Sequence, residues 1–197
     1  MSYNIFFTSD THFGHKNMIK FIDYDGNRVR PFDTWEEADE IMVQNWNSVV
    51  KPEDKVYFLG DLCFNRNYGD KLMPRLLGKK CLIRGNHDLF KLSWYALWFY
   101  DVRGVYNFEN FLMTHVPVHP DSKARFKMNL HGHLHRGLVY KQNKHGGTTK
   151  IPDPWYRNVC MDANDYKLIP YEQIQHEFSV YKQRGEIIIP PKTIIER

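Results

Sequence analysis

Three short apolar runs in the first half of the chain each end at a small residue followed by a polar one. The runs cover residues 3–8, 55–59 and 80–84, and they are rich in aromatic and β-branched side chains. Runs of this length and composition are typical of buried β-strands. The next residues read Ser-Asp, Gly-Asp and Gly-Asn, so a polar side chain follows each predicted strand. The chain is therefore constrained to a sheet whose strand ends carry functional groups.

Helical patterns separate these strands. The segment Thr34-Trp-Glu-Glu37 is a capping box, and apolar residues at three- and four-residue steps from Trp35 to Val49 predict an amphipathic helix. A second helix is predicted over 69–77, with Gly78 as its stop signal. Strands that alternate with helices imply a mainly parallel sheet, in which the carboxyl ends of the strands are the usual place for a site.

The second half of the chain carries further strand patterns and few helices. Strand-like runs predict a second sheet built as a meander; they lie at 101–106, 109–114, 126–131 and 157–161. The segments 23–33 and 141–156 are predicted to be surface loops.

A last helix is predicted near the C-terminus. Its apolar face is marked by Tyr171, Ile174, Phe178 and Tyr181, and Gly185 is expected to end it. The residues after it, 186–191, are predicted to form an edge strand or an arm, because two prolines exclude a central strand.

Length and hydrophobic content favour one domain. A chain of 197 residues with 42% hydrophobic residues can bury one sizeable core, so we expect a single domain over 1–197. The motif-bearing region is 3–162, and the C-terminal helix and tail cover 170–197. The sequence has neither a membrane-spanning apolar run nor the features of a signal peptide, so a soluble, cytoplasmic protein is expected.

The cysteines and the net charge argue against several classes of protein. The three cysteines, Cys63, Cys81 and Cys160, are odd in number and far apart, which predicts buried free thiols rather than disulfides or a zinc cluster. A formal charge of +4 suits an anionic substrate. The basic residues are spread along the chain, so no stable complex with nucleic acid is predicted.

Polar side chains at the strand ends have the chemistry of metal ligands. Asp10 and His12 follow the first predicted strand, and residues two apart on an extended chain point to the same side, so both can reach one ion. Asp61 follows the second strand and Asn86 follows the third. Taken singly, each of these is ordinary turn or cap chemistry.

Two later strands repeat the pattern. His115 ends the run at 109–114, and His133 and His135 follow the run at 126–131 on alternate positions, which predicts one shared face. Repetition at five strand ends indicates a metal site rather than a set of turns. The seven potential ligands are Asp10, His12, Asp61, Asn86, His115, His133 and His135.

These blocks resemble the signature blocks of the calcineurin-like metallophosphoesterase superfamily. They occur in the order of that family and span residues 10–135: Asp10-x-His12, Gly60-Asp61, Gly85-Asn86-His87-Asp88, His115 and Gly132-His133-x-His135. The resemblance implies an α/β fold in which two mixed β-sheets pack as a sandwich with flanking helices, in four αββα layers. The order of strands and helices predicted above agrees with that fold.

The resemblance also implies a division of the ligands between two ions. The residues at the matching positions are Asp10, His12 and His135 for the first ion, Asn86, His115 and His133 for the second, and Asp61 as the bridge. Two aspartates cancel only half of the charge of two divalent ions, which leaves a cationic pocket for a phosphate. Between the ions a bridging water would be a hydroxide, able to attack phosphorus. The mixed nitrogen and oxygen ligands suit manganese, iron, zinc or nickel better than calcium. Two manganese ions are the expected cofactors, with iron, zinc or nickel as alternatives.

His87 is implied as the general acid toward the leaving oxygen, and together with Asp61 it forms the predicted catalytic pair. Two positions depart from patterns in the family. Many phosphoprotein phosphatases carry an acidic residue where this chain has Phe64, and many members carry glycine where it has Thr114. The sequence does not identify the residue that orients His87, and Asp88 is a candidate. Phe64 in place of the acidic residue argues against a phosphoprotein phosphatase.

Several basic residues close to the blocks are candidates for substrate contact. His15, Arg66 and Arg136 are the leading ones, and the others are Arg30 and Arg84. For each of them, a solvated surface charge is the competing interpretation.

Within the superfamily, the chain is most similar to the small single-domain bacterial and bacteriophage phosphoesterases. The similarity includes the start Asp-Thr-His-Phe-Gly-His, the segment Arg30-Pro31-Phe32 and the helix end Gln44-Asn45-Trp46-Asn47. The expected activity is that of a hydrolase, a dinuclear-metal phosphodiesterase acting on nucleotides or cyclic nucleotides. The alternatives are a phosphomonoesterase on nucleotides or phosphoproteins, a DNA nuclease, and a non-catalytic scaffold with the same fold.

Overall fold

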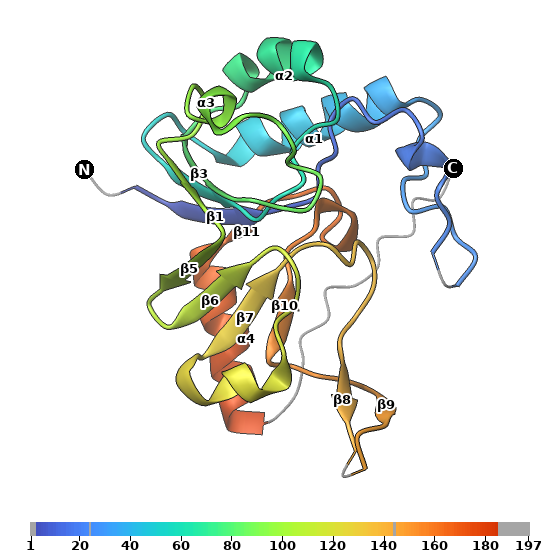
Figure 1. Ribbon diagram of the computed structural model, residues 1–197, viewed down its shortest axis with the longest axis vertical. Helices are drawn as coiled ribbons and strands as arrows, with labels where there is room; N and C mark the ends of the chain where they lie inside the picture. The colour runs from blue at the N-terminus through green and yellow to red at the C-terminus, as the bar shows by residue number, and fades with distance from the viewer. Residues whose placement is uncertain (1–2, 24, 144, 185–197) are drawn as a thin grey trace.

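The computed structural model describes residues 3–23, 25–143 and 145–184 (Figure 1). The predicted arm at 186–191 and the predicted stop at Gly185 lie outside these residues. The three cysteines are buried and free, as the sequence predicts. Among the described residues, no helix has both the length and the apolar character needed to cross a membrane.

The first sheet is mixed and carries the strands of the N-terminal half. Its order is β11-β1-β2-β3-β4, with β1 to β4 parallel and β11 antiparallel to β1. The bounds are β1 (Ile5–Thr8), β2 (Lys55–Phe58), β3 (Lys79–Ile83), β4 (Asp101–Arg103) and β11 (Ile169–Pro170). The three strands predicted from the apolar runs are confirmed. They give the sheet a single edge where β1, β2 and β3 end.

The second sheet is also mixed, with the order β10-β7-β6-β5. Its bounds are β5 (Val105–Phe108), β6 (Phe111–Thr114), β7 (Met128–His131) and β10 (Tyr156–Asn158). The predicted meander is wrong, because β6, β7 and β10 run parallel and only β5 is antiparallel to its neighbour β6. The 3-10 turn η3 (Pro120–Arg125) lies in the crossover between β6 and β7.

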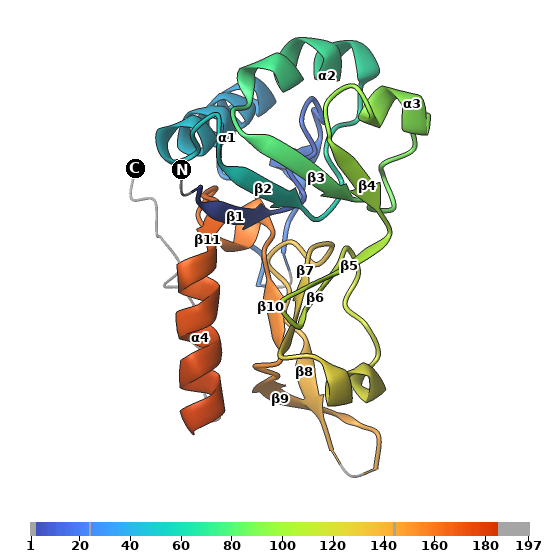
Figure 2. The same ribbon diagram turned by 90° about the vertical axis from the view of Figure 1, so that its left-hand side faces the viewer.

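Two of the predicted boundaries also shift. The run at 101–106 divides near Gly104, so that β4 pairs in the first sheet and β5 in the second. The predicted loop at 141–156 contains most of a small hairpin, β8 (Tyr140–Gln142) and β9 (Thr148–Pro152), which extends away from both sheets (Figures 1 and 2).

Helices cover one face of the first sheet (Figure 2). They are α1 (Trp35–Val49), α2 (Arg66–Leu72) with the 3-10 turn η2 (Met73–Arg75), and α3 (Leu92–Tyr95). The predicted N-cap is confirmed, because Thr34 Oγ1 accepts a hydrogen bond from Glu37 N at 3.1 Å. The return bond of the capping box is shifted by one residue, because Glu37 Oε2 accepts a hydrogen bond from Asp33 N at 3.0 Å rather than from Thr34 N. The second predicted helix begins earlier than expected, at Arg66.

Two apolar cores hold these layers together. Trp46 and Phe58 belong to the core between α1 to α3 and the first sheet. Phe7 and Tyr57 project from the other face of that sheet, stack with ring centroids 5.7 Å apart, and join Met113 of the second sheet in the second core. The predicted α/β fold of two mixed sheets with flanking helices is thus confirmed.

The last helix, α4 (Tyr171–Arg184), packs beside the second sheet (Figure 2). Phe178 lies edge-on to Phe111 with centroids 5.8 Å apart. Arg157 of β10 and Glu177 of α4 form a buried ion pair at 2.6 Å. These contacts hold α4 against β6 and β10 of the second sheet.

Candidate metal centre

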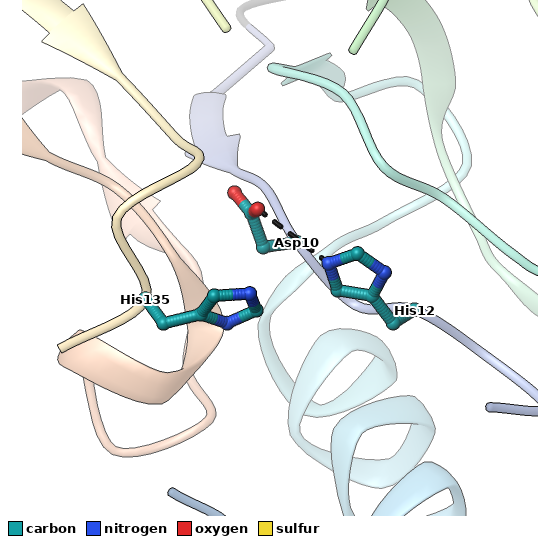
Figure 3. A group of neighbouring side chains, drawn as sticks. All are labelled: Asp10, His12 and His135. Atoms are coloured by element: carbon teal, nitrogen blue, oxygen red, sulfur yellow. Dashed lines mark ion pairs between the residues drawn. The ribbon is translucent and has the colours of Figure 1, made fainter. Parts of the chain in front are cut away.

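The structure brings the seven predicted ligands together around two adjacent positions. At the first position, ligand atoms of Asp10, His12 and His135 lie within 4.8 Å of one another. Figure 3 shows that Asp10 and His12 come from the segment after β1, whereas His135 approaches from the segment after β7. The first position is therefore built by both sheets.

The second position is centred on the amide oxygen of Asn86. Asn86 Oδ1 lies 2.8 Å from His115 Nε2 and 2.9 Å from His133 Nδ1. Asp61 stands between the two positions, because its Oδ2 is 3.6 Å from His12 Nε2 and 3.3 Å from His115 Nε2. One carboxylate oxygen can thus serve both groups.

Most of the predicted ligands have an unusual backbone conformation. Five of them have positive φ: Asp10 (56°), His12 (45°), Asp61 (59°), His133 (69°) and His135 (49°). The left-handed region costs a residue other than glycine about 1 kcal/mol or more, and such strain gathers at functional sites. The turn chemistry of Asp and His makes them the more tolerant residues there.

This conformation corrects two predictions about direction. Asp10 and His12 converge, but on a tight turn rather than on an extended chain. His133 and His135 do not share one face, because the turn between them sends His133 to Asn86 and His135 to the first position. Alternation along a strand does not apply where the strand has already ended.

Each carboxylate of the centre is held through one oxygen. Asp10 Oδ2 accepts hydrogen bonds from His133 N at 2.9 Å and Cys160 Sγ at 3.1 Å. Asp61 Oδ1 accepts one from His87 N at 2.8 Å. The second oxygens, Asp10 Oδ1 and Asp61 Oδ2, are thereby directed to the histidines of the two positions.

Glycines at the strand ends leave room for these carboxylates. A Cβ atom at Gly85 would lie 2.2 Å from Asp61 Oδ1, and one at Gly132 would lie 2.4 Å from Asp10 Oδ2. Both distances are far below van der Waals contact. The glycines therefore serve the packing of the site as well as the turn.

A buried polar network supports the first position. His135 Nδ1 lies 2.6 Å from Asp162 Oδ2, and Asp162 Oδ1 accepts a hydrogen bond from Arg30 Nε at 2.7 Å. Arg30 also donates to the carbonyl oxygens of Asp10 and Thr11, each at 2.7 Å. A carboxylate on Nδ1 fixes the ring so that Nε2 faces the site, which is the common outer support of a metal-binding histidine.

The sequence gives no signal for Asp162, because it lies outside the strand-end blocks at 10–135 and no other potential ligand stands next to it. The expectation that Arg30 contacts the substrate is wrong, because Arg30 is only 1% exposed and is paired with Asp162. The ion pair is what keeps a guanidinium buried here, since an unpaired buried charge is strongly unfavourable.

Fewer polar side chains orient the predicted ligands of the second position. His115 Nδ1 lies 2.7 Å from the carbonyl oxygen of Leu59, so this nitrogen carries a proton and Nε2 is the nitrogen directed to the centre. His115 is buried, but Asn86 and His133 are both exposed. This side of the centre is therefore the one that faces solvent.

Coupled charges shift the pKa values of the centre. Burial alone would raise the pKa of Asp61, but its hydrogen bond to His115 lowers it overall. Burial would lower the pKa of His115, but Asp61 and Asp10 raise it to about 9. Protons on His115 therefore compete with any metal ion at the second position, because metal-bound histidine is neutral.

Several buried nitrogen and oxygen atoms of the centre make no hydrogen bond among the described residues, and these atoms fit a metal centre. Asp10 Oδ1 and both ring nitrogens of His12 are buried and make no hydrogen bond with the described part of the chain. Unsatisfied buried polar atoms are costly and uncommon, so an ion that binds them explains their arrangement. Carboxylate, imidazole and amide ligands suit divalent transition metals.

His87 lies at the edge of the centre with its side chain exposed. Its ring is 5.5 Å from that of His12 and 5.0 Å from that of Phe64, centroid to centroid. Asp88, the sequence candidate for its partner, instead accepts hydrogen bonds from the backbone N–H groups of Asp61, Leu62 and Gly85. Asp88 thus joins the ends of β2 and β3, and among the described residues no carboxylate contacts the His87 ring.

The remaining candidates for substrate contact lie at different depths. His15 is half-buried and stacks on Phe64, next to the first position. Arg136 is 3.4 Å from Tyr166 Oη and 3.8 Å from Asp23 Oδ2. Arg66 is largely exposed and pairs weakly with Asp70 at 3.9 Å. Arg84 donates to the carbonyl oxygen of Asp88, which leaves His15 as the candidate in ring contact with a predicted ligand.

Proteins with similar sequences include bacteriophage proteins. The chain is 37% identical over 137 residues to the uncharacterized protein MJ1445 of Methanocaldococcus jannaschii, covering 66% of this chain and 69% of that protein. It is 26% identical over 205 residues to the Gene 66 protein of Mycobacterium phage D29, covering 87% of this chain and 94% of that protein.

The fold has a solved counterpart. The structure of a protein of unknown function from Aquifex aeolicus, AQ665, matches with a TM-score of 0.64 at 27% identity, covering 89% of this chain and 99% of that one. The family model of calcineurin-like phosphoesterases matches residues 3–177, which include all the strand ends described above. The chain belongs to the calcineurin-like phosphoesterase family and is a metal-dependent hydrolase of phosphoric esters.

Proposed function

We propose that the protein is a dinuclear phosphodiesterase that acts on nucleotide-like phosphodiesters, with manganese as the preferred metal. The observation that carries this proposal is the position of Asp61 Oδ2, 3.6 Å from His12 of one ligand group and 3.3 Å from His115 of the other. Two bound ions would activate a water molecule as the nucleophile and neutralise the phosphoryl oxygens.

The side chains supply position and charge. Asp10 and Asp61 are the carboxylates of the centre, and their charges cancel only half of that of two divalent ions. The remaining positive charge attracts the phosphodiester anion. The histidines and Asn86 add ligand atoms without adding negative charge.

His87 is proposed to donate a proton to the leaving oxygen. It is exposed at the rim, while its backbone N–H is fixed by Asp61 Oδ1 at 2.8 Å. The ring can therefore contact a substrate whose phosphate lies over the centre. A proton donor of this kind contributes about 10²–10⁴-fold to the rate.

An open rim supports a diester rather than a monoester substrate. Asn86, His87 and His133 are all exposed, so this side of the centre is open to a substrate that carries a second ester group. Phe64 also stands where many phosphoprotein phosphatases carry an acidic residue. These two features favour a phosphodiester over a phosphoprotein.

The proposal is tested with manganese-loaded protein and two substrates, bis(p-nitrophenyl) phosphate and p-nitrophenyl phosphate. Faster turnover of the diester is expected. Asp61→Asn should nearly abolish turnover, whereas Asp121→Asn, which changes an aspartate whose side chain is 93% exposed outside the centre, should not.

Other outcomes select the alternatives. Much faster turnover of the monoester indicates a phosphomonoesterase, and cleavage of single- or double-stranded DNA indicates a nuclease. Absence of hydrolysis on both esters and on nucleotides would contradict the proposal and favour a scaffold.

A further inference from the structure

An exposed aromatic surface lies beside the candidate metal centre. It consists of Phe64, His15 and Phe21, which we call the aromatic platform. Phe64 and His15 stack with centroids 4.0 Å apart and planes 12° apart, and Phe21 meets His15 edge-on at 5.7 Å. Phe64 is 42% exposed and Phe21 is 47% exposed.

The platform is fixed rather than loose. Phe64 N donates a hydrogen bond to Phe13 O at 3.1 Å, and the preceding residue, Cys63, forms a β-bridge with Phe13. His15 N donates to His12 O at 3.0 Å. His15 Nδ1 makes no hydrogen bond with the described residues, so ring stacking is what orients this imidazole.

Its place relative to the proposed chemistry is specific. The Phe64 ring is 5.0 Å from the ring of His87 and 5.7 Å from the ring of His12, centroid to centroid. If His87 protonates the leaving oxygen, the leaving group departs past Phe64. A single exposed phenylalanine needs no explanation, but Phe64 is 42% exposed, stacked on His15 and adjacent to the proposed proton donor, which places its ring within reach of a leaving group.

We propose that Phe64 is a specificity-determining residue that stacks on an aromatic ring in the leaving group, and that it thereby selects a nucleobase-bearing phosphodiester. This rests on the proposed function, because it takes His87 as the proton donor. Every nucleobase has a π-face, so stacking on one phenylalanine favours bases over sugars or alkyl groups without selecting one base. A puckered sugar or a branched alkyl group cannot lie flat on the ring.

The test compares two phosphate monoesters, adenosine 5′-monophosphate and ribose 5-phosphate, as analogues of the phosphate and leaving group of the substrate. In each, the sugar is joined to phosphorus through the ester oxygen that His87 would protonate, and only the first carries a base. Their affinities are measured by calorimetry on manganese-loaded protein, which needs no turnover. The wild type should bind the adenosine compound about tenfold or more tightly, the usual size of a base–aromatic stack. Phe64→Leu, which keeps an apolar side chain and loses the flat ring, should remove most of that difference and leave the binding of ribose 5-phosphate unchanged.

Two variants control for indirect effects. Phe64→Trp keeps a flat ring and should retain the preference, and Tyr140→Leu, which changes an exposed aromatic residue of β8 outside the platform, should behave as wild type. Circular dichroism of each variant checks that it is folded.

Equal binding of the two ligands by the wild type, no measurable binding of adenosine 5′-monophosphate, or a full preference in Phe64→Leu would each overturn the inference. These outcomes are separate from the test of the proposed function. Hydrolysis of bis(p-nitrophenyl) phosphate without a preference for the base would support the proposed diesterase activity and overturn the role of Phe64. A preference for the base without hydrolysis of any ester would support base stacking on Phe64 and overturn the proposed diesterase activity.

Discussion

The two positions of the candidate centre differ in burial and in support. At the first, Asp10 and His12 are buried, and His135 is backed by the fully buried Asp162 and by Arg30. At the second, Asn86 and His133 are exposed. The first position is thus enclosed by an outer set of polar partners, and the second is open on one side.

This difference has a chemical consequence. Outer partners that orient metal ligands typically change metal affinity by about 10–100-fold. We therefore expect the first position to bind its ion more tightly and the second to exchange its ion more readily. The open position is also the one at which a substrate can approach.

The largest effect is expected from Asp61→Asn, because Asp61 is the residue shared by the two positions. Loss of the shared carboxylate should weaken both ions and lower kcat/KM by roughly 10³-fold, equivalent to several kcal/mol of charge stabilisation. Metal content after gel filtration and steady-state kinetics measure the two effects. Loss of only one ion would show that the positions do not share this residue.

Asn86→Ala removes a predicted ligand of the second position alone. The affinity of the weaker ion should fall by more than about 100-fold, beyond the range of outer-partner changes, while the tighter ion stays bound. The midpoint of thermal unfolding should change little, because Asn86 is exposed. Asn17→Ala, at another exposed asparagine, is the matched control. Loss of the tighter ion would reverse the proposed ranking.

Asp162→Asn tests the support of the first position. It should weaken the tighter ion by about 10–100-fold and leave the other ion nearly unchanged. Burial alone would raise the pKa of Asp162, but Arg30 and His135 hold it at about 2, so the carboxylate is charged at neutral pH and the variant leaves Arg30 without its counter-charge. A loss of about 3–5 kcal/mol of stability is the usual effect of breaking such a buried pair.

A double variant separates these two effects of Asp162. Arg30→Met combined with Asp162→Asn removes both charges, and it should recover part of the stability but none of the metal affinity. Recovery of affinity together with stability would mean that Asp162 acts only on the fold.

The smallest effect is expected from Cys160→Ala. The thiol lies 3.1 Å from Asp10 Oδ2, which also accepts a hydrogen bond from His133 N. Loss of one weak hydrogen bond corresponds to about 1 kcal/mol, so the tighter ion should weaken by less than about tenfold. Calorimetric titration measures this change, and an effect as large as that of Asp162→Asn would make the thiol a main support of Asp10.

The strands that carry the site could be predicted from sequence patterns, whereas most contacts within the site could not. The apolar runs before Asp10, Asp61 and Asn86 are local signals, and the strands that they predict were found. The second sheet was harder to predict, because strand direction depends on the crossover at η3 rather than on any local pattern.

The support of the site could not be predicted for a similar reason. Asp162 reaches His135 across 27 positions and Arg30 across 132, and no spacing rule links such residues. The positive φ of Asp10 and His133 could not be predicted from the sequence either. Glycine is the usual marker of that conformation, and neither residue is glycine.

The most direct test of two unequal positions that share Asp61 is a titration of metal-free wild-type protein with Mn²⁺, followed by calorimetry and checked by metal analysis of the saturated protein. We predict two ions per chain, the first bound about tenfold or more tightly than the second. Saturation at one ion per chain, or two ions of equal affinity, would contradict this account.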